Sequence, residues 1–169
     1  TGYMFAHQKY GITPDILLIA KGMGGGMPVG AFVANKTLMS HLAKNPALGH
    51  ITTFGGHPVC IAAAFATLKI LCQKRYVSEV LHKENMLRKL LVHPKIKTVR
   101  SSGLMTGVEL TKESYLTPMI NKVIENGVLI DYFLFNNVSF RISPPLIISE
   151  EELIHGAKTI LAALDSIDN

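Results

Sequence analysis

The sequence contains no tryptophan, and cysteine occurs only twice among its 169 residues. Cys60 and Cys72 fall in one predicted helix, where their separation of about 18 Å along the axis is too large for a disulfide. We expect both thiols to be buried and reduced, which is typical of the cytoplasm. The cysteine content therefore argues against a small disulfide-stabilised secreted domain.

Long apolar runs and metal-ligand spacings are also missing. No apolar stretch approaches the roughly 20 residues of a membrane-spanning helix, and residues 1–20 lack the basic start and apolar core of a secretory signal. The seven histidines show neither an HExxH nor an H-x₃₋₅-H pattern, so we expect no zinc site. We therefore predict a cytoplasmic protein with no membrane partner and no metal.

Basic residues outnumber acidic residues by 17 to 12, which gives a net charge of +5. The basic residues, Lys83 and Lys95 among them, are dispersed, and aromatic residues are not interleaved with them. This pattern favours solvated helix faces over a nucleic-acid surface, so we expect no nucleic-acid partner. Hydrophobic residues make up 48% of the chain, which is enough for a packed core.

Apolar patterns alternate with glycine and proline breaks, which predicts an α/β chain of mixed strands and helices. Pro58 opens the longest helical pattern, since proline is favourable in a first helical turn. The expected elements of the first half are a buried strand at 16–20, a short strand at 31–34, a helix at 37–43, a largely buried helix at 59–74 and an amphipathic helix at 77–91.

The composition changes near His93-Pro94, where we expect a domain boundary that separates residues 1–93 from residues 94–169. Ser149 and Glu152 have the spacing of a capping box, which predicts the start of the last helix. The expected elements of the second part are strands within 99–110, a helix at 116–125, strands at 128–130 and 138–142, and a helix from 149 to about 167.

Lys21 is the first candidate for chemistry. It follows the apolar strand and precedes five glycines within nine residues, from Gly22 to Gly30. A buried or crowded lysine loses its proton near neutral pH and becomes a nucleophilic amine, which forms Schiff bases with carbonyl compounds. A solvated lysine after a strand is the alternative. A nucleotide-binding glycine loop is a distant one, because Gly24-x-Gly26 lacks the full dinucleotide-binding spacing.

Two further segments carry candidate binding residues. The run Thr52–Gly56 offers hydroxyls and backbone N–H groups that suit a phosphate, with an ordinary loop as the alternative. Arg141 follows an alternating strand and precedes Ser143 and two prolines. An arginine held rigidly there suits a carboxylate ligand through two parallel hydrogen bonds, with a structural ion pair as the alternative.

Together these segments resemble the class III aminotransferases, which are pyridoxal 5'-phosphate (PLP) enzymes of fold type I. The resemblance runs almost from end to end, and five ordered motifs are more specific than any one alone. The segments that carry it are Thr1–Asp15, Ala20–Ala31, His50–Pro58, Arg100–Met105 and Phe140–Leu146. Acetylornithine, ornithine, lysine and 4-aminobutyrate aminotransferases are the relatives that it suggests.

The resemblance implies a role for each candidate residue. Lys21 binds PLP covalently and moves a proton as an acid–base catalyst. Thr53, with help from Thr52, binds the cofactor phosphate across the interface of a homodimer. Arg141 pairs with the carboxylate of an amino acid or 2-oxo acid. The implied reaction transfers an amino group from an amino acid or ω-amino donor to a 2-oxo acid, with 2-oxoglutarate as the expected acceptor.

The family's sequence is longer on the N-terminal side, where it has a phosphate loop, an aromatic that stacks on PLP and an aspartate that pairs the pyridinium nitrogen. We therefore expect this chain to contain the C-terminal part of the large domain and the small α+β domain. By itself it is expected to be inactive or nearly so. The competing interpretation is a non-catalytic dimerisation or binding module that retains the fold.

Overall fold

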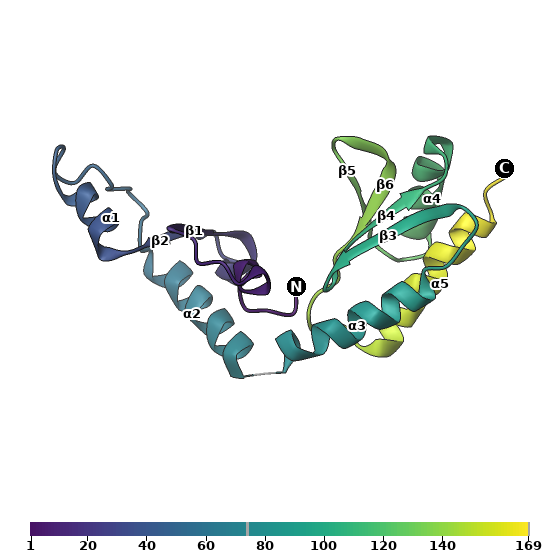
Figure 1. Ribbon diagram of the computed structural model, residues 1–169, viewed down its shortest axis with the longest axis horizontal. Helices are drawn as coiled ribbons and strands as arrows, with labels where there is room; N and C mark the ends of the chain where they lie inside the picture. Colours follow the sequence, from purple (N-terminus) through teal and green to yellow (C-terminus); the bar gives the residue numbers. More distant parts are fainter. Residues whose placement is uncertain (74, 169) are drawn as a thin grey trace. The chain divides into compact units, whose positions relative to one another are not determined.

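A computed structural model describes residues 1–73 and 75–168 of the chain. Their contacts divide them into two compact units (Figure 1). The N-terminal unit comprises Ala6–Arg75, and the C-terminal unit comprises Thr1–Phe5 together with Tyr76–Asn169. The contacts therefore group residues 76–93 with the C-terminal unit. The assignment of residues 1–93 and 94–169 to two domains of a complete enzyme stays a prediction.

The N-terminal unit contains two short strands and one long helix, as the sequence predicts, and the strands pair as an antiparallel sheet. Ile16 pairs with Ala34 and Ile19 with Ala31, so the glycine-rich segment forms the connection between the two strands. The elements are η1 (Ala6–Tyr10), β1 (Ile16–Ile19), η2 (Lys21–Gly24), β2 (Ala31–Ala34), α1 (Lys36–Ser40), η3 (His41–Ala43) and α2 (Pro58–Gln73).

The burial predicted for this unit is confirmed at Cys60 and is wrong for Cys72, for the rest of α2 and for β1. Only Cys60 is buried on α2, whereas Cys72 is exposed. Phe65 is 67% exposed on α2 and Leu18 is 78% exposed on β1. The reason is that a sheet of two strands and one apolar helix are too small to cover each other, so apolar surface remains open within this unit.

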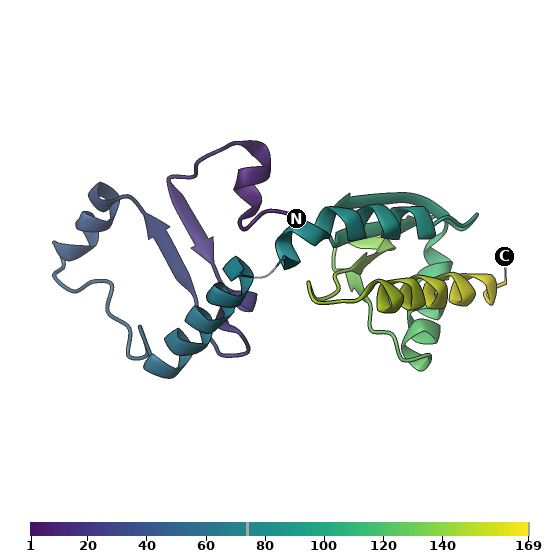
Figure 2. The same ribbon diagram turned by 90° about the horizontal axis from the view of Figure 1, so that it is seen from below.

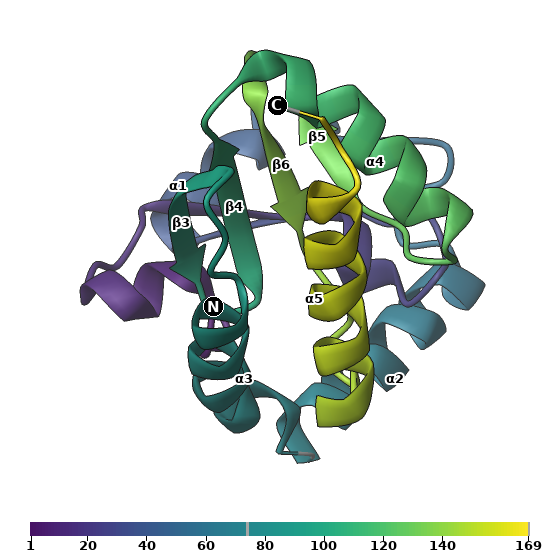
Figure 3. The same ribbon diagram turned by 90° about the vertical axis from the view of Figure 1, so that its right-hand side faces the viewer.

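The C-terminal unit is a four-stranded antiparallel sheet, in the order β3-β4-β6-β5, with helices on one face (Figures 1 and 3). Figure 2 shows α3 and α5 alongside each other, and their contacts confirm it. The elements are α3 (Tyr76–Leu90), β3 (Ile96–Ser102), β4 (Met105–Leu110), η4 (Glu113–Tyr115), α4 (Leu116–Glu125), β5 (Asp131–Phe133), β6 (Asn136–Ile142) and α5 (Glu150–Asp165).

The core lies between this sheet and the three α-helices. Val108 and Phe140 face each other across β4 and β6 and are fully buried. Met119 and Val123 of α4, and Leu164 of α5, are also fully buried. The alternation of the strands places Gly107 and Arg141 on the opposite face of the sheet. That face carries Arg141, the residue predicted to bind a carboxylate, and its cross-strand partner Asp131.

The strand predicted at 128–130 is wrong, because β5 begins only at Asp131. Gly127 ends α4 with a positive φ of 83°, and its N–H donates to the carbonyl of Ile124. The N–H of Val128 donates to the carbonyl of Val123. These two hydrogen bonds form a Schellman motif, so Gly127 and Val128 are part of the C-terminal cap of α4. Val128 and Ile130 are apolar because they pack against the core.

The predicted start of the last helix is confirmed. Ser149 accepts a hydrogen bond from the Glu152 N–H at 3.1 Å, and the Glu152 carboxylate accepts one from the Ser149 N–H at 2.8 Å. The two bonds complete the capping box and begin α5 at Glu150.

Among the described residues, no helix is long and apolar enough to cross a membrane. No group of three or more histidine, cysteine, aspartate or glutamate side chains in this part of the chain is placed to bind a metal ion.

Candidate functional site

Lys21 lies where β1 ends and the glycine-rich segment begins. Ala20 is still extended, and Lys21 then adopts a φ of +55° as the first residue of η2. A residue with a side chain is strained in this left-handed region by about 1–3 kcal/mol. The fold therefore holds Lys21 in a left-handed conformation, which a connection from a strand to a loop does not require.

An open depression of about 530 Å³ lies next to Lys21. It is lined by Lys21 and by Gly26, Met27, Pro28 and Val29. A Cβ atom at Gly26 would meet nothing within 4 Å, so no other group fills the space beside that backbone. The amine of Lys21 is exposed, and a ligand can approach it from the depression.

Gly25 holds the lysine segment against α2. Its φ is +57°, and its N–H donates to the Gly22 carbonyl at 3.2 Å. A Cβ atom at Gly25 would lie 2.1 Å from the hydroxyl of Thr67, which donates to the Ala63 carbonyl at 3.0 Å. The close approach is possible only for glycine, so this contact helps to fix the position of Lys21.

Thr52 and Thr53 lie in an exposed turn directly before α2. The Gly55 N–H donates to the Thr52 carbonyl at 3.3 Å, and the His57 N–H donates to the Phe54 carbonyl at 3.2 Å. A Cβ atom at Gly55 would lie 2.5 Å from the Thr52 hydroxyl. The turn thus presents hydroxyl groups beside a helix N-terminus, an arrangement that suits a phosphate.

Arg141 lies on β6 with Gly107 opposite it on β4 and Asp131 opposite it on β5. Its Nη2 atom is 2.5 Å from the Oδ2 atom of Asp131. The ion pair is the alternative that the sequence left open for Arg141. Because the arginine side chain remains 44% exposed, the pair leaves room for a ligand at the guanidinium.

A second ion-pair cluster involves the same sheet. Glu109 on β4 accepts from Lys97 at 2.7 Å and from Arg100 at 2.6 Å. The hydrogen bond from Lys97, followed by that from Arg100, lowers the pKa of Glu109 from its usual value near 4.5. Arg100 is thereby paired with a carboxylate, and the register places it opposite Gly107.

The predicted site residues are divided between the two units. Lys21, Thr52 and Thr53 belong to the N-terminal unit, and Arg141 belongs to the C-terminal unit. Neither unit by itself holds the full predicted set. Sequence reasoning missed Asp131, since the strand predicted at 128–130 ends before it and leaves it without a partner.

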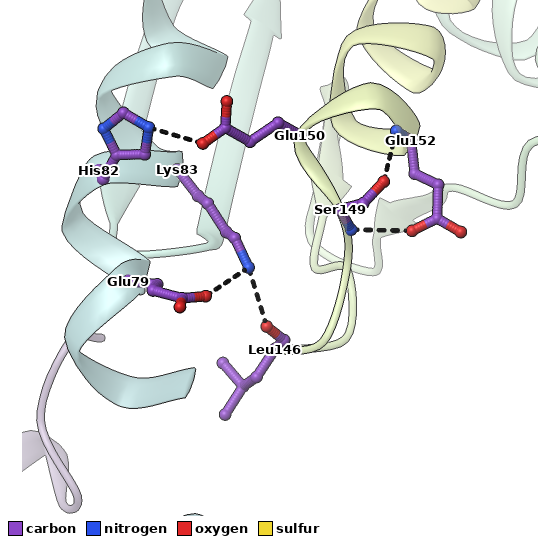
Figure 4. Close-up of polar contacts among 7 residues, drawn as sticks. All are labelled: Glu79, His82, Lys83, Leu146, Ser149, Glu150 and Glu152. Carbon is purple, nitrogen blue, oxygen red and sulfur yellow. Dashed lines mark hydrogen bonds and ion pairs between the residues drawn. The ribbon is translucent and has the colours of Figure 1, made fainter. Parts of the chain in front are cut away.

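Lys83 is another residue whose environment the sequence did not reveal. It was expected on a solvated helix face, but it is only 6% exposed. Its Nζ atom donates to the Leu146 carbonyl and to the Glu79 carboxylate, each at 3.3 Å, and these contacts are drawn in Figure 4. Lys83 thus ties α3 to the segment that follows Arg141. His82 adds a contact with Glu150 at 2.9 Å.

Lys95 departs from the same expectation. Its Nζ atom donates to the carbonyls of Leu164 at 3.0 Å and Ile167 at 2.5 Å. Lys95 thus adds a donor for carbonyl groups at and just beyond the end of α5, where the regular donors of the helix run out. The basic residues of the C-terminal unit therefore have structural roles besides solvation.

We expect Lys83→Ala to lower the free energy of unfolding by about 1–3 kcal/mol, because it leaves the carbonyl of a partly buried residue, Leu146, without this donor. Lys89→Ala on the exposed side of the same helix is the matched control. Urea unfolding of the two variants measures the difference. Equal midpoints would show that the Lys83 contacts add nothing to stability.

A family model described as aminotransferase class-III matches residues 1–164 of the chain. The match covers both units and every predicted site residue. The chain belongs to the class-III aminotransferase family. Enzymes of this family depend on PLP, so the predictions of family and cofactor class are confirmed.

Named relatives and solved structures agree with this assignment. An acetylornithine aminotransferase from Haemophilus ducreyi is 40% identical over 163 residues, which cover 96% of this chain and 39% of the relative. A putrescine aminotransferase from Pectobacterium atrosepticum is 38% identical over 175 residues, covering 98% of this chain and 37% of the relative. The chain therefore spans about two fifths of the length of these curated relatives.

The fold prediction is confirmed by solved aminotransferase structures. The acetylornithine aminotransferase of Elizabethkingia anophelis matches with a TM-score of 0.86 at 29% identity, over 99% of this chain and 45% of that one. A Bacillus anthracis aminotransferase matches with a TM-score of 0.89 at 26% identity, over 99% of this chain and 42% of that one. The class-III chain thus corresponds to part of a larger fold.

The residues of this class-III chain fit PLP. Lys21 offers an accessible amine at the edge of a depression, and the cofactor's aldehyde requires such an amine. Thr52 and Thr53 offer hydroxyl groups next to the N-terminus of α2, where a phosphate is favoured. Gly26 leaves the space beside the depression free of a side chain. The chemistry of these residues therefore suits PLP.

Proposed function

We propose that the protein carrying this chain transfers an amino group from an amino acid or ω-amino donor to a 2-oxo acid with PLP as its cofactor. The observation that carries the proposal is the position of Lys21. It is a strained lysine at the end of a strand, beside an open depression, in a chain whose residues 1–164 match one aminotransferase family. The two relatives described above are both named aminotransferases, which supports the same reaction class.

In this proposal each site residue has a defined task. Bound PLP supplies an electron sink for negative charge that develops on the substrate carbon. Lys21 would hold the cofactor covalently, and once the amino donor has displaced it, its free amine would move the proton between the substrate carbon and the cofactor carbon. Thr53, helped by Thr52, donates hydrogen bonds to the cofactor phosphate. Arg141 orients the substrate through its carboxylate.

The names of the relatives support a proposal for the substrates. Acetylornithine and putrescine, in the relatives' names, both carry an amino group at a chain end, so we propose an ω-amino donor. We propose 2-oxoglutarate as the acceptor, because its carboxylates suit Arg141. The proposed assembly is a cytoplasmic homodimer in which Thr53 serves the partner's cofactor.

We also propose that this chain by itself does not catalyse transamination. It spans 39% of the acetylornithine aminotransferase relative, and α2 exposes large apolar side chains such as Phe65. Residues outside the chain would cover this surface and complete the PLP site. Among them we expect the acidic partner of the pyridinium nitrogen, without which PLP is a weaker electron sink.

A trapping experiment tests the proposal. The complete protein is incubated with PLP, reduced with borohydride and digested, and mass spectrometry locates the modified lysine. We expect the modification on Lys21 and none above background in Lys21→Ala, whereas Lys36→Ala, a control at an exposed lysine of the same unit, keeps it. Modification of other lysines in place of Lys21 would contradict the proposal. Robust transamination by the isolated chain would refute the proposal that the chain is inactive by itself.

The exposed apolar surface of α2 is also compatible with the second candidate function, a non-catalytic module that dimerises or binds a partner through this fold. The same experiment separates the two functions. A complete protein that assembles but never acquires PLP on Lys21 would favour the binding module.

A further inference from the structure

The carboxylate of Asp131 has two hydrogen-bond partners, and the proposed function gives Asp131 itself no task. Its Oδ1 atom accepts a hydrogen bond from the backbone N–H of Tyr132 at 2.9 Å. Its Oδ2 atom accepts one from Nη2 of Arg141 at 2.5 Å. The first bond is local to β5, so it orients the carboxylate whether or not Arg141 is engaged. A fixed anion therefore points at the guanidinium.

The sheet register makes this pairing a built-in property of the fold. Asp131 is the direct cross-strand partner of Arg141, and such opposed side chains lie within contact distance on one face. On the other side of Arg141 the opposite residue is Gly107, which has no side chain to offer. A Cβ atom at Gly107 would lie 3.4 Å from the ring of Phe133. The cross-strand neighbours thus supply a single carboxylate.

The pair is nevertheless open to ligands. The side chains of Arg141 and Asp131 are 44% and 58% exposed. Both residues line a cavity of about 500 Å³ in the C-terminal unit, whose wall includes the apolar residues Val128, Ile130 and Ile142. A dissolved anion can therefore reach the guanidinium while Asp131 is beside it.

We propose that Asp131 limits the affinity of the site for its substrate by competing with the substrate carboxylate for Arg141. This inference rests on the proposed function of Arg141. The internal pair uses one Nη2 contact, whereas a free carboxylate can make two parallel hydrogen bonds to a guanidinium. A ligand with a second anchoring group elsewhere in the site replaces the internal contact. A simple anion such as acetate lacks that anchor and competes poorly.

Asp131→Asn in the complete, PLP-loaded enzyme tests the competition. The amide keeps an oxygen for the Tyr132 N–H and removes the charge. Exposed ion pairs contribute up to about 1 kcal/mol, so we expect the KM for 2-oxoglutarate to fall roughly twofold to fivefold. The inhibition constant of acetate should fall as well. Glu125→Gln, which changes the net charge equally at an exposed pair with Lys122, is the control.

A second readout does not depend on turnover. Calorimetric titration with glutarate, a dicarboxylate that cannot accept an amino group, should show a similar gain in affinity for Asp131→Asn and none for Glu125→Gln. An unchanged or weaker affinity, or a higher KM, would overturn the competition and indicate that Asp131 only positions Arg141.

The role of Arg141 is tested separately. In Arg141→Gln the affinity for glutarate should fall at least tenfold, a loss typical of a bidentate charged contact. If this variant binds glutarate as the unchanged enzyme does, the proposed function of Arg141 fails. If it binds weakly while Asp131→Asn has no effect, only the inference about Asp131 fails.

Discussion

Lys21→Ala should lower kcat of the complete enzyme by at least about 10²–10⁴-fold, the range that a positioned acid–base group contributes. The variant loses both the covalent attachment of PLP and the amine that moves the proton. The structure supports a specialised role because Lys21 has a φ of +55° and borders the depression. Single-turnover measurements with a saturating amino donor isolate this chemical step from cofactor loading.

Two further variants separate the amine from other properties of the position. Lys21→Arg keeps the positive charge but not an amine that attaches to PLP, so we expect it to be about as impaired as Lys21→Ala. Lys36→Ala changes an exposed lysine of α1 in the same unit and should retain turnover. A Lys21→Arg enzyme with nearly normal kcat would show that charge alone matters there, and the assigned role would be wrong.

The sequence predicted most of the elements because their signals are local. The apolar run at 16–20 and the proline at position 58 depend on neighbours in the chain, and both elements formed where expected. The capping box at Ser149 is equally local and is confirmed. The apolar run at 128–130 was wrongly predicted to be a strand, because an apolar run indicates burial without specifying the backbone conformation. The burial of Val128 follows from the Schellman stop of α4.

The sequence predicted which residues belong to the candidate site, but it did not predict the ion pair between Asp131 and Arg141. The motifs around Lys21, Thr53 and Arg141 are runs of neighbouring residues, so a resemblance can find them. Asp131 and Arg141 are ten residues apart, and they meet only because β5 and β6 pair in one register. A shift of that register by one residue would move Asp131 to the other face of the sheet. A cross-strand contact of this kind can therefore be identified only from the structure.

The glycine-rich segment beside Lys21 leads to a prediction about stability. Gly25→Ala should lower the free energy of unfolding by roughly 2–5 kcal/mol, from the strain of a positive φ and from overpacking. Gly25 has a φ of +57°, and its new Cβ atom would lie 2.1 Å from the Thr67 hydroxyl. For a chain of this size the melting temperature should fall by roughly 5–15 °C, which calorimetry measures.

Neighbouring glycines separate the two causes. Gly26 has a φ of +97° with nothing within 4 Å of an added Cβ atom, so Gly26→Ala measures the conformational strain alone. Gly22 has equal space without a positive φ, and Gly22→Ala should change stability little. Thr67→Ala in the Gly25→Ala background removes the hydroxyl. It should recover the part of the unfolding free energy that overpacking had cost. If Gly25→Ala is no worse than Gly26→Ala, the segment is not held against α2, and the position of Lys21 must be maintained by other contacts.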